Sequence, residues 1–398
     1  MKIQTKNAII IGLISTLSYL AVYIARNVLS AVSPTLISNG LFDENNIGTL
    51  SSIFFFTYAV GQLINGIIGD FIKSKYMITL GLVIAGVSSI FLPIFSQSVI
   101  TTNVLYGIMG FALAMIYAPL TKLIAENTSQ NHAVKCNLFL NFAAYFGAPL
   151  ASGFAIILSW QKTFKTSGII LIFMAVLSFL IFSFLEHKKA IKFNKRQKNK
   201  TTKSNSALGV LIKRDIIRFT FVSILTGIIR TTVLFWLPVY LTQHLKFSDN
   251  ESKTINMIFA FLISAASFIA VWIYKFFKQN MNKTLIFSFA IATVFFLLCA
   301  FVNREFVNIF VLLIAIIASN CAATMLWSVY CPSLSDTGLV SSATGYLDFI
   351  SYMSASIASK LFANAVSDIG WGGLIFVWVA LMVIGVVISF PIKKRCDA

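Results

Sequence analysis

Runs of about 20 predominantly apolar residues recur from one end of the sequence to the other, and they limit its possible folds more than any other feature. A run of this length matches the roughly 30 Å hydrocarbon thickness of a bilayer when it forms an α-helix. Only 11% of the residues are charged, whereas soluble proteins carry about 25%. The sequence therefore predicts an all-α polytopic membrane protein embedded in the lipid bilayer.

The boundaries of the apolar runs predict twelve transmembrane helices. They fall near residues 8–37, 46–71, 76–97, 101–126, 136–159, 165–185, 216–243, 254–275, 284–302, 306–330, 339–365 and 371–391. The stretch between the sixth and seventh helices is polar and basic, so it cannot bury a core. We therefore predict two six-helix halves, residues 1–185 and 216–398, joined by a basic cytoplasmic linker at 186–215.

The net charge of +18 is gathered on one side of the predicted helices. Eight lysines and arginines between Lys188 and Lys203 contribute +8 without any acid. By the positive-inside rule, this linker and both termini face the cytoplasm. The basic charge therefore indicates membrane topology rather than nucleic-acid binding. A bias toward Lys, Asn and Ile is typical of an AT-rich bacterial genome, so we expect a multi-pass protein of a bacterial inner membrane.

Two arginines deep inside apolar spans give the strongest functional signal. Arg26 is followed eight residues later by Pro34, and Arg230 by Pro238, with an offset of 204 residues in both cases. This repeat indicates two pseudo-symmetric halves with a site between them. A buried arginine costs at least about 2.5–3.5 kcal/mol on insertion scales, and Asp348 is the one acid deep in a predicted helix. We expect an anionic substrate to neutralise the surplus charge; pairing within the protein or snorkelling is the alternative.

Polar side chains share the predicted helices with these arginines. Tyr19, Tyr23 and Arg26 stand at i, i+4 and i+7 and form one stripe. Ser223, Gly227 and Arg230 repeat the spacing with small residues that should leave room beside the arginine. Further candidates in apolar stretches are Tyr58, Gln62, Asn141, Tyr145 and Tyr352. A tyrosine in a membrane helix can equally serve packing, so its role as a ligand depends on convergence with the arginines.

A short loop follows the second predicted helix. Gly66 and Gly69 permit close helix approach. Asp70 can pair with a neighbouring helix in one conformation and release it in another, and Lys73 follows on the cytoplasmic side. We interpret this loop as a conformational switch; the structural alternative is a helix cap followed by ordinary cytoplasmic lysines.

Together these features resemble the major facilitator superfamily and, within it, the organophosphate:phosphate antiporter family. The matching segments are Tyr-Ile-Ala-Arg-Asn at 23–27, the Arg230–Pro238 segment, Thr-Gly-Tyr at 344–346 with Tyr352, and Gly-Trp-Gly-Gly at 370–373. The resemblance implies that Arg26 and Arg230 bind phosphate from opposite halves. It also implies that Tyr19, Tyr23, Tyr58 and Tyr352 lie near the bound anion.

The sequence departs from the family pattern at several positions. Asn27 and Gln62 stand where the family has lysines, Ala144 replaces a histidine of the glycerol-3-phosphate branch, and Gly227 replaces a tyrosine. Asp348 has no counterpart in the pattern. The phosphate clamp is kept while auxiliary positive charge is lost, which predicts a substrate that is less charged, bulkier or different in its organic part.

We therefore expect a monomeric secondary transporter that exchanges a phosphorylated or other organic anion for inorganic phosphate. The five cysteines and three histidines show no metal-ligand spacing, so no metal or cofactor is expected. No nucleophile–base arrangement indicates an enzyme. Two alternatives remain: an H⁺-coupled organic-anion symporter, in which Asp348 carries the proton, and a membrane sensor of a sugar phosphate.

Overall fold

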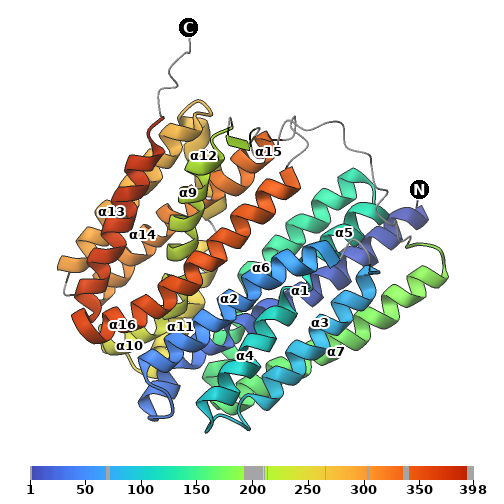
Figure 1. Cartoon of the computed structure of the whole chain (residues 1–398), viewed down its shortest axis with the longest axis horizontal. Helices are drawn as coiled ribbons and strands as arrows, with labels where there is room; N and C mark the ends of the chain where they lie inside the picture. Colours follow the sequence, from blue (N-terminus) through green and yellow to red (C-terminus); the bar gives the residue numbers. More distant parts are fainter. Residues whose placement is uncertain are drawn as a thin grey trace. The chain divides into compact units, whose positions relative to one another are not determined.

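The computed structural model of the 398-residue chain describes residues 2–68, 72–191, 209, 211–212, 214–264, 266–302, 304–334 and 340–391. These residues form helices and short connections, grouped into two compact units (Figure 1). The first unit is Met1–Lys200 with Phe235–Phe261, and the second is Thr201–Leu234 with Leu262–Ala398.

The first unit is built from the N-terminal helices and one hairpin from the second half of the sequence. Its helices are α1 (Lys2–Ser38), α2 (Glu44–Ile68), α3 (Ser74–Phe91), α4 (Val99–Leu113), α5 (Tyr117–Asn127), α6 (Gln130–Ile157), α7 (Trp160–His187), α10 (Leu234–Gln243) and α11 (Asp249–Ile263).

Glycines set the closest helix contacts in the first unit. Helix α1 packs along α6, α2 along α4, and α3 along α7 (Figure 1). At Gly147 of α6, an added Cβ would lie only 2.3 Å from the Cβ of Tyr23 on α1. At Gly110 of α4, it would lie 2.7 Å from the Phe54 carbonyl oxygen on α2. Small residues let membrane helices approach closely, and here they fix the two helices that flank Arg26.

The second unit contains the remaining helices. They are α9 (Ile216–Ile228), the π-helical turn η1 (Ile229–Val233), α12 (Ala266–Phe276), α13 (Met281–Phe301), α14 (Glu305–Met325), the π-helical turn η2 (Leu326–Tyr330), α15 (Cys331–Ser333) and α16 (Val340–Ser389). Helix α16 packs against α9 and α13, and α13 packs against α14 (Figure 1).

Arg218 ties the two ends of this unit's chain together. Its Nε donates a hydrogen bond of 2.9 Å to the Ile388 carbonyl, and its Nη2 donates to the Ser389 carbonyl. These carbonyls lie in the last turn of α16, which has no intrahelical donors for them. A cation there also suits the negative end of the helix dipole, so Arg218 caps α16.

The predicted spans agree with the structure in position but not in every boundary. Within the described ranges, ten helical stretches are long and apolar enough to cross a membrane, and a shorter one covers 142–157. The label α16 covers two helices that meet at Gly370, where φ is +68°, and these two helices correspond to the last two predicted spans. The predicted fourth span is divided into α4 and α5. The basic cluster at 192–203 lies outside the described residues.

Candidate substrate-binding site

Arg26 lies on α1 inside a shell of aromatic rings. Its Cζ is 5.0 Å from the ring centroid of Tyr58, 5.3 Å from that of Tyr23 and 5.9 Å from that of Phe55. Cation–π contacts contribute roughly 0.5–2 kcal/mol each, so three of them offset an insertion cost of about 2.5–3.5 kcal/mol. The rings thus help to stabilise the guanidinium within an apolar helix.

Tyr23 is held in place from two sides. Gly147 allows α6 to rest directly on its backbone, and the Asn27 amide donates a 2.7 Å hydrogen bond to its carbonyl. Its ring meets that of Tyr19 edge-on, with centroids 5.0 Å apart, and Tyr19 in turn lies 5.2 Å from Tyr117. The predicted stripe of Tyr19, Tyr23 and Arg26 thus forms part of one continuous aromatic cluster.

The sequence analysis missed three members of this cluster: Phe55, Tyr106 and Tyr117. Phe55 precedes Tyr58 by three residues, so both rings occupy one face of α2. Tyr106 on α4 is buried, its ring centroid lies 4.9 Å from that of Phe54 with the rings tilted by 33°, and it lies within electrostatic reach of Arg26. With 38 phenylalanines in the sequence, nothing distinguished Phe55 beforehand. Tyr106 could have been found as a hydroxyl in an apolar span.

Arg230 lies in the π-helical turn η1, between α9 and α10, and is half-buried. Such turns are rare and occur frequently at functional sites. Our expectation that Ser223 and Gly227 leave open room on this helix was wrong. A Cβ at Gly227 would lie 2.3 Å from the hydroxyl of Ser351, and Ser223 donates a 2.7 Å hydrogen bond to the Leu347 carbonyl. Helix α16 fills that space.

Tyr352 and Asp348 both lie on α16. Tyr352 is 5% exposed and immediately follows the residue that packs on Gly227. Asp348 is half-buried. Tyr352 therefore lies on the part of α16 that packs against Gly227. Gly227 is three residues before Arg230 in the sequence.

The predicted switch loop is described only in part. Gly69 and Asp70 lie outside the described residues. The side-chain surroundings of Gly66 and Asn141 are also not described. Gln62, on α2, is half-buried. Lys73 forms a 2.5 Å ion pair with Glu186 on α7. This contact raises the pKa of Lys73.

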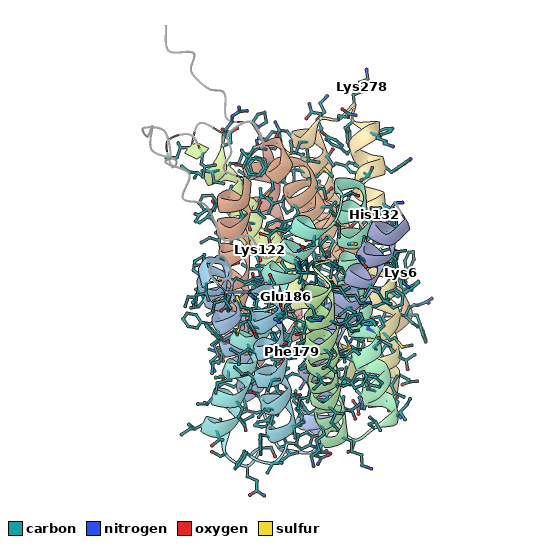
Figure 2. All side chains as sticks on the ribbon, turned by 90° about the vertical axis from the view of Figure 1, so that its right-hand side faces the viewer. Lys6, Lys122, His132, Phe179, Glu186 and Lys278 are labelled. Carbon is teal, nitrogen blue, oxygen red and sulfur yellow. The ribbon has the colours of Figure 1, made fainter. Side chains whose placement is uncertain are left out.

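Glu186, the partner of Lys73, was not identified by the sequence analysis. It also pairs with Lys75 at 2.6 Å, and the Lys75 ammonium lies 5.5 Å from the ring of Phe179, two turns earlier on α7 (Figure 2). The loop's two lysines are thus fixed to the end of α7 within the first unit.

An apolar groove of about 640 Å³ lies elsewhere in the first unit, between α2, α3 and α4. It is lined by residues such as Ile53, Leu80, Val104 and Ile108 and holds none of the candidate site residues. Because its rim is exposed on membrane-spanning helices, it suits lipid chains rather than an anion. In the parts of the chain that the structure describes, no three His, Cys, Asp or Glu side chains gather as a metal site.

A bundle of long apolar helices defines a polytopic membrane protein. The sequence profile of the Major Facilitator Superfamily matches residues 15–359, and the chain belongs to that superfamily. It is therefore an integral multi-pass membrane protein and a secondary transporter rather than an enzyme.

Comparison with known proteins narrows the relationship. A "Probable hexose phosphate transport protein" of Chlamydia trachomatis is 20% identical, with 94% of this chain and 88% of that protein covered. The "Glycerol-3-phosphate transporter" of Bacillus subtilis is 22% identical, with 96% and 92% covered. The "Membrane sensor protein UhpC" of Escherichia coli is 30% identical over 95 residues, which is 24% of this chain and 21% of that protein. The chain is thus related to organophosphate transporters at low identity.

Solved structures support the fold. A crystal structure of a D-xylose-proton symporter has a TM-score of 0.73 to this chain at 15% identity, with 96% of each chain covered. At this identity the likeness concerns the fold alone, which is that of the Major Facilitator Superfamily.

Proposed function

We propose that this transporter carries a phosphorylated organic anion and exchanges it for inorganic phosphate. The observation that carries the proposal is Arg26, a guanidinium set in an apolar helix and surrounded by three aromatic rings. Arginine presents a planar fork of donors that fits phosphate oxygens two at a time. The relationship to hexose-phosphate and glycerol-3-phosphate transporters supports phosphate as the recognised group.

In this mechanism Arg26 and Arg230 hold the phosphoryl group from the two halves of the protein. Tyr23, Tyr58 and Tyr352 contact the remainder of the substrate. An empty site carries two like charges, and their repulsion opposes closure around it. A bound anion removes the repulsion and so stabilises the closed intermediate relative to the open states. That difference couples outward movement of one anion to inward movement of another.

The wider architecture follows from the same proposal. Twelve spans form two related halves, residues 1–185 and 216–398, with the linker at 186–215 and both termini in the cytoplasm. The protein works as a monomer in a bacterial inner membrane. Gly66, Asp70, Lys73 and Asp348 take part in switching or coupling.

Phosphate counterflow tests the proposal directly. The purified protein is placed in proteoliposomes loaded with unlabelled phosphate, and uptake of labelled phosphate is measured without any proton gradient. We expect uptake that depends on internal phosphate and is inhibited by external hexose phosphates or glycerol 3-phosphate. Uptake that requires a proton gradient would instead support the H⁺-coupled symporter. Saturable binding of an organophosphate without exchange would support a sensor.

The arginine substitutions identify the site. Arg26→Lys and Arg230→Lys keep the charge but replace the bidentate fork by a point charge. We expect each to raise the half-saturation concentration for phosphate at least tenfold, which is the loss of one charge-assisted hydrogen bond of about 1.5–3 kcal/mol. Arg304→Lys, at an exposed loop position, is the matched control. Near-normal affinity in either site variant would exclude a two-arginine clamp.

A further inference from the structure

One hairpin, Phe235–Phe261, packs with the helices of the first half although it belongs to the second half of the sequence. We call this segment the outer hairpin, because the predicted topology places its turn on the extracytoplasmic side. It contains most of α10 and α11. The π-helical turn η1 ends at Val233, two residues before it. The start of the outer hairpin therefore follows an interruption of regular α-helix.

Hydrogen bonds from side chains hold the outer hairpin on the first half. They join Ser30 to the Phe235 carbonyl, Thr35 to Asp249, Gln243 to Glu44, and Asn256 to Ser152. The rings of Phe55 and Phe235 add an edge-on contact with centroids 6.1 Å apart. These polar contacts lie at separate points along the hairpin.

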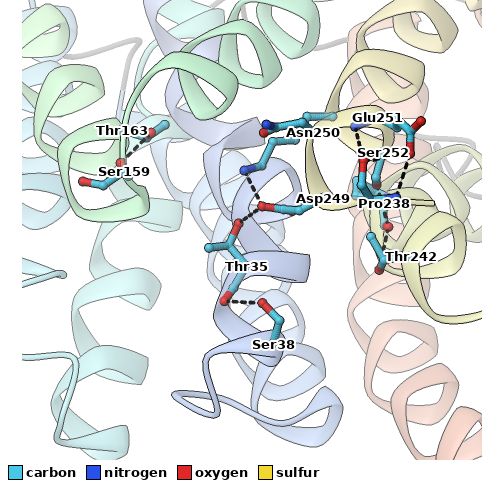
Figure 3. A network of polar contacts seen from close by, with 12 residues as sticks. Thr35, Ser38, Ser159, Thr163, Pro238, Thr242, Asp249, Asn250, Glu251 and Ser252 are labelled. Carbon is cyan, nitrogen blue, oxygen red and sulfur yellow. Dashed lines mark hydrogen bonds and ion pairs between the residues drawn. The ribbon is translucent and has the colours of Figure 1, made fainter. Parts of the chain in front are cut away.

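Asp249 is the charged centre of this contact (Figure 3). Its Oδ2 accepts a 2.6 Å hydrogen bond from the Thr35 hydroxyl and pairs at 2.7 Å with the ammonium of Lys253, a side chain that is only 6% exposed. Its Oδ1 is buried and has no hydrogen-bond partner among the described residues. The Asp249 side chain as a whole is 36% exposed, but an oxygen without a hydrogen bond gives up part of the stabilisation that a complete network would provide. The contact is thus held by charge but incompletely satisfied.

We propose that Asp249 and Thr35 form a releasable latch between α1 and the outer hairpin. The latch is closed in the structure described here and must open when the substrate site is exposed to the outside. This inference rests on the proposed transport function, because only a transporter needs the two halves to separate on that side. Lys253 orients Asp249 from one turn further along the same helix.

Thiol labelling tests the latch without reference to any substrate. Ser152→Cys places a reporter at a fully buried position beneath Asn256 of the outer hairpin. Its rate of alkylation by a membrane-impermeant maleimide is measured in the full-length protein from the outside, with the native cysteines replaced by serine. We expect Thr35→Val, which removes the hydroxyl and keeps the side-chain shape, to raise the rate about tenfold, corresponding to about 1.4 kcal/mol.

Thr242→Val is the matched control, because the Thr242 hydroxyl bonds only to carbonyls of the outer hairpin itself, those of Pro238 and Val239. It should leave the labelling rate within twofold. Equal labelling in the Thr35 and Thr242 variants would overturn the latch.

Cross-linking supplies the second measurement. Thr35→Cys with Asp249→Cys should form a disulfide under mild oxidation, stop phosphate exchange, and regain it on reduction. Exchange that persists in the fully cross-linked protein would show that the contact need not open, and so would reject the latch. Absence of phosphate exchange in the unmodified protein would reject the proposed function, while the labelling result would still report whether the hairpin opens.

Discussion

Replacing Gly147 by alanine should test how precisely α1 is positioned, because one methyl group there acts on the segment that carries Arg26. The added Cβ would lie 2.3 Å from the Tyr23 Cβ and 2.5 Å from the Tyr23 carbonyl carbon. Carbon atoms in good contact are about 3.5–4.0 Å apart. Helix α1 must therefore move by about 1.2 Å, or α6 must bend by a similar amount. Because two of the atoms in the way belong to the backbone, rotation of a side chain cannot relieve the clash.

The expected cost follows from two opposing effects. Overpacking of a tightly filled contact costs about 1–3 kcal/mol, and a glycine-to-alanine change within a helix regains about 0.5–1 kcal/mol. The net loss of stability should be about 1–2 kcal/mol. If α1 yields instead, Arg26 is displaced by about 1 Å, and a displacement of this size in a binding site can reduce the rate of the assisted step by up to about 10²-fold.

Gly153→Ala is the matched control on the same helix, because nothing lies within 4 Å of the Cβ it would add. Unfolding in detergent can be followed with a thiol-reactive dye, since Cys136 and Cys299 are buried in the folded protein. We expect a lower unfolding temperature or a large loss of phosphate exchange for Gly147→Ala, and neither for Gly153→Ala. Equal behaviour of the two variants would refute the view that α6 sets the position of Arg26.

Two further predictions concern the second unit. If Asp348 offsets the arginine charge or carries a proton, Asp348→Asn should shift the pH dependence of transport or the preference for mono- over dianions. An unchanged pH profile and an unchanged anion preference would show that the role of Asp348 is structural. Arg218→Gln should lower the free energy of unfolding by about 1–3 kcal/mol, because two carbonyls at the end of α16 lose charged donors, whereas Lys283→Gln at an exposed position should be neutral in the same melting assay.

The sequence predicted the all-helical membrane fold well because the main signal, the length of each apolar run, depends only on neighbouring residues in the sequence. A helix that crosses a bilayer needs about 20 apolar residues, so each span could be recognised in the sequence without knowledge of its neighbours. The predicted boundary between the last two spans lies at Gly370, where the structure separates two helices by a φ of +68°. A difference lies in the predicted fourth span, which the structure divides into α4 and α5.

The candidate site was predictable only to the extent that its residues are chemically unusual in a membrane. An arginine in an apolar span must be accounted for, and the tyrosine stripe followed from helical spacing. Phe55 has no such signal, since phenylalanine is abundant in every span. Gly227 was misread for a related reason: a missing side chain suggests space, whereas here it marks the point where another helix approaches most closely.

The π-helical turn at Arg230 means that the repeat in the sequence is not a repeat in space. Arg26 and Pro34 are separated by eight residues of uninterrupted α-helix, whereas the eight residues from Arg230 to Pro238 begin inside η1. A single π turn takes up one extra residue, and one residue of an α-helix corresponds to about 100° of rotation about its axis. Relative to its arginine, Pro238 is therefore rotated about the helix axis compared with Pro34.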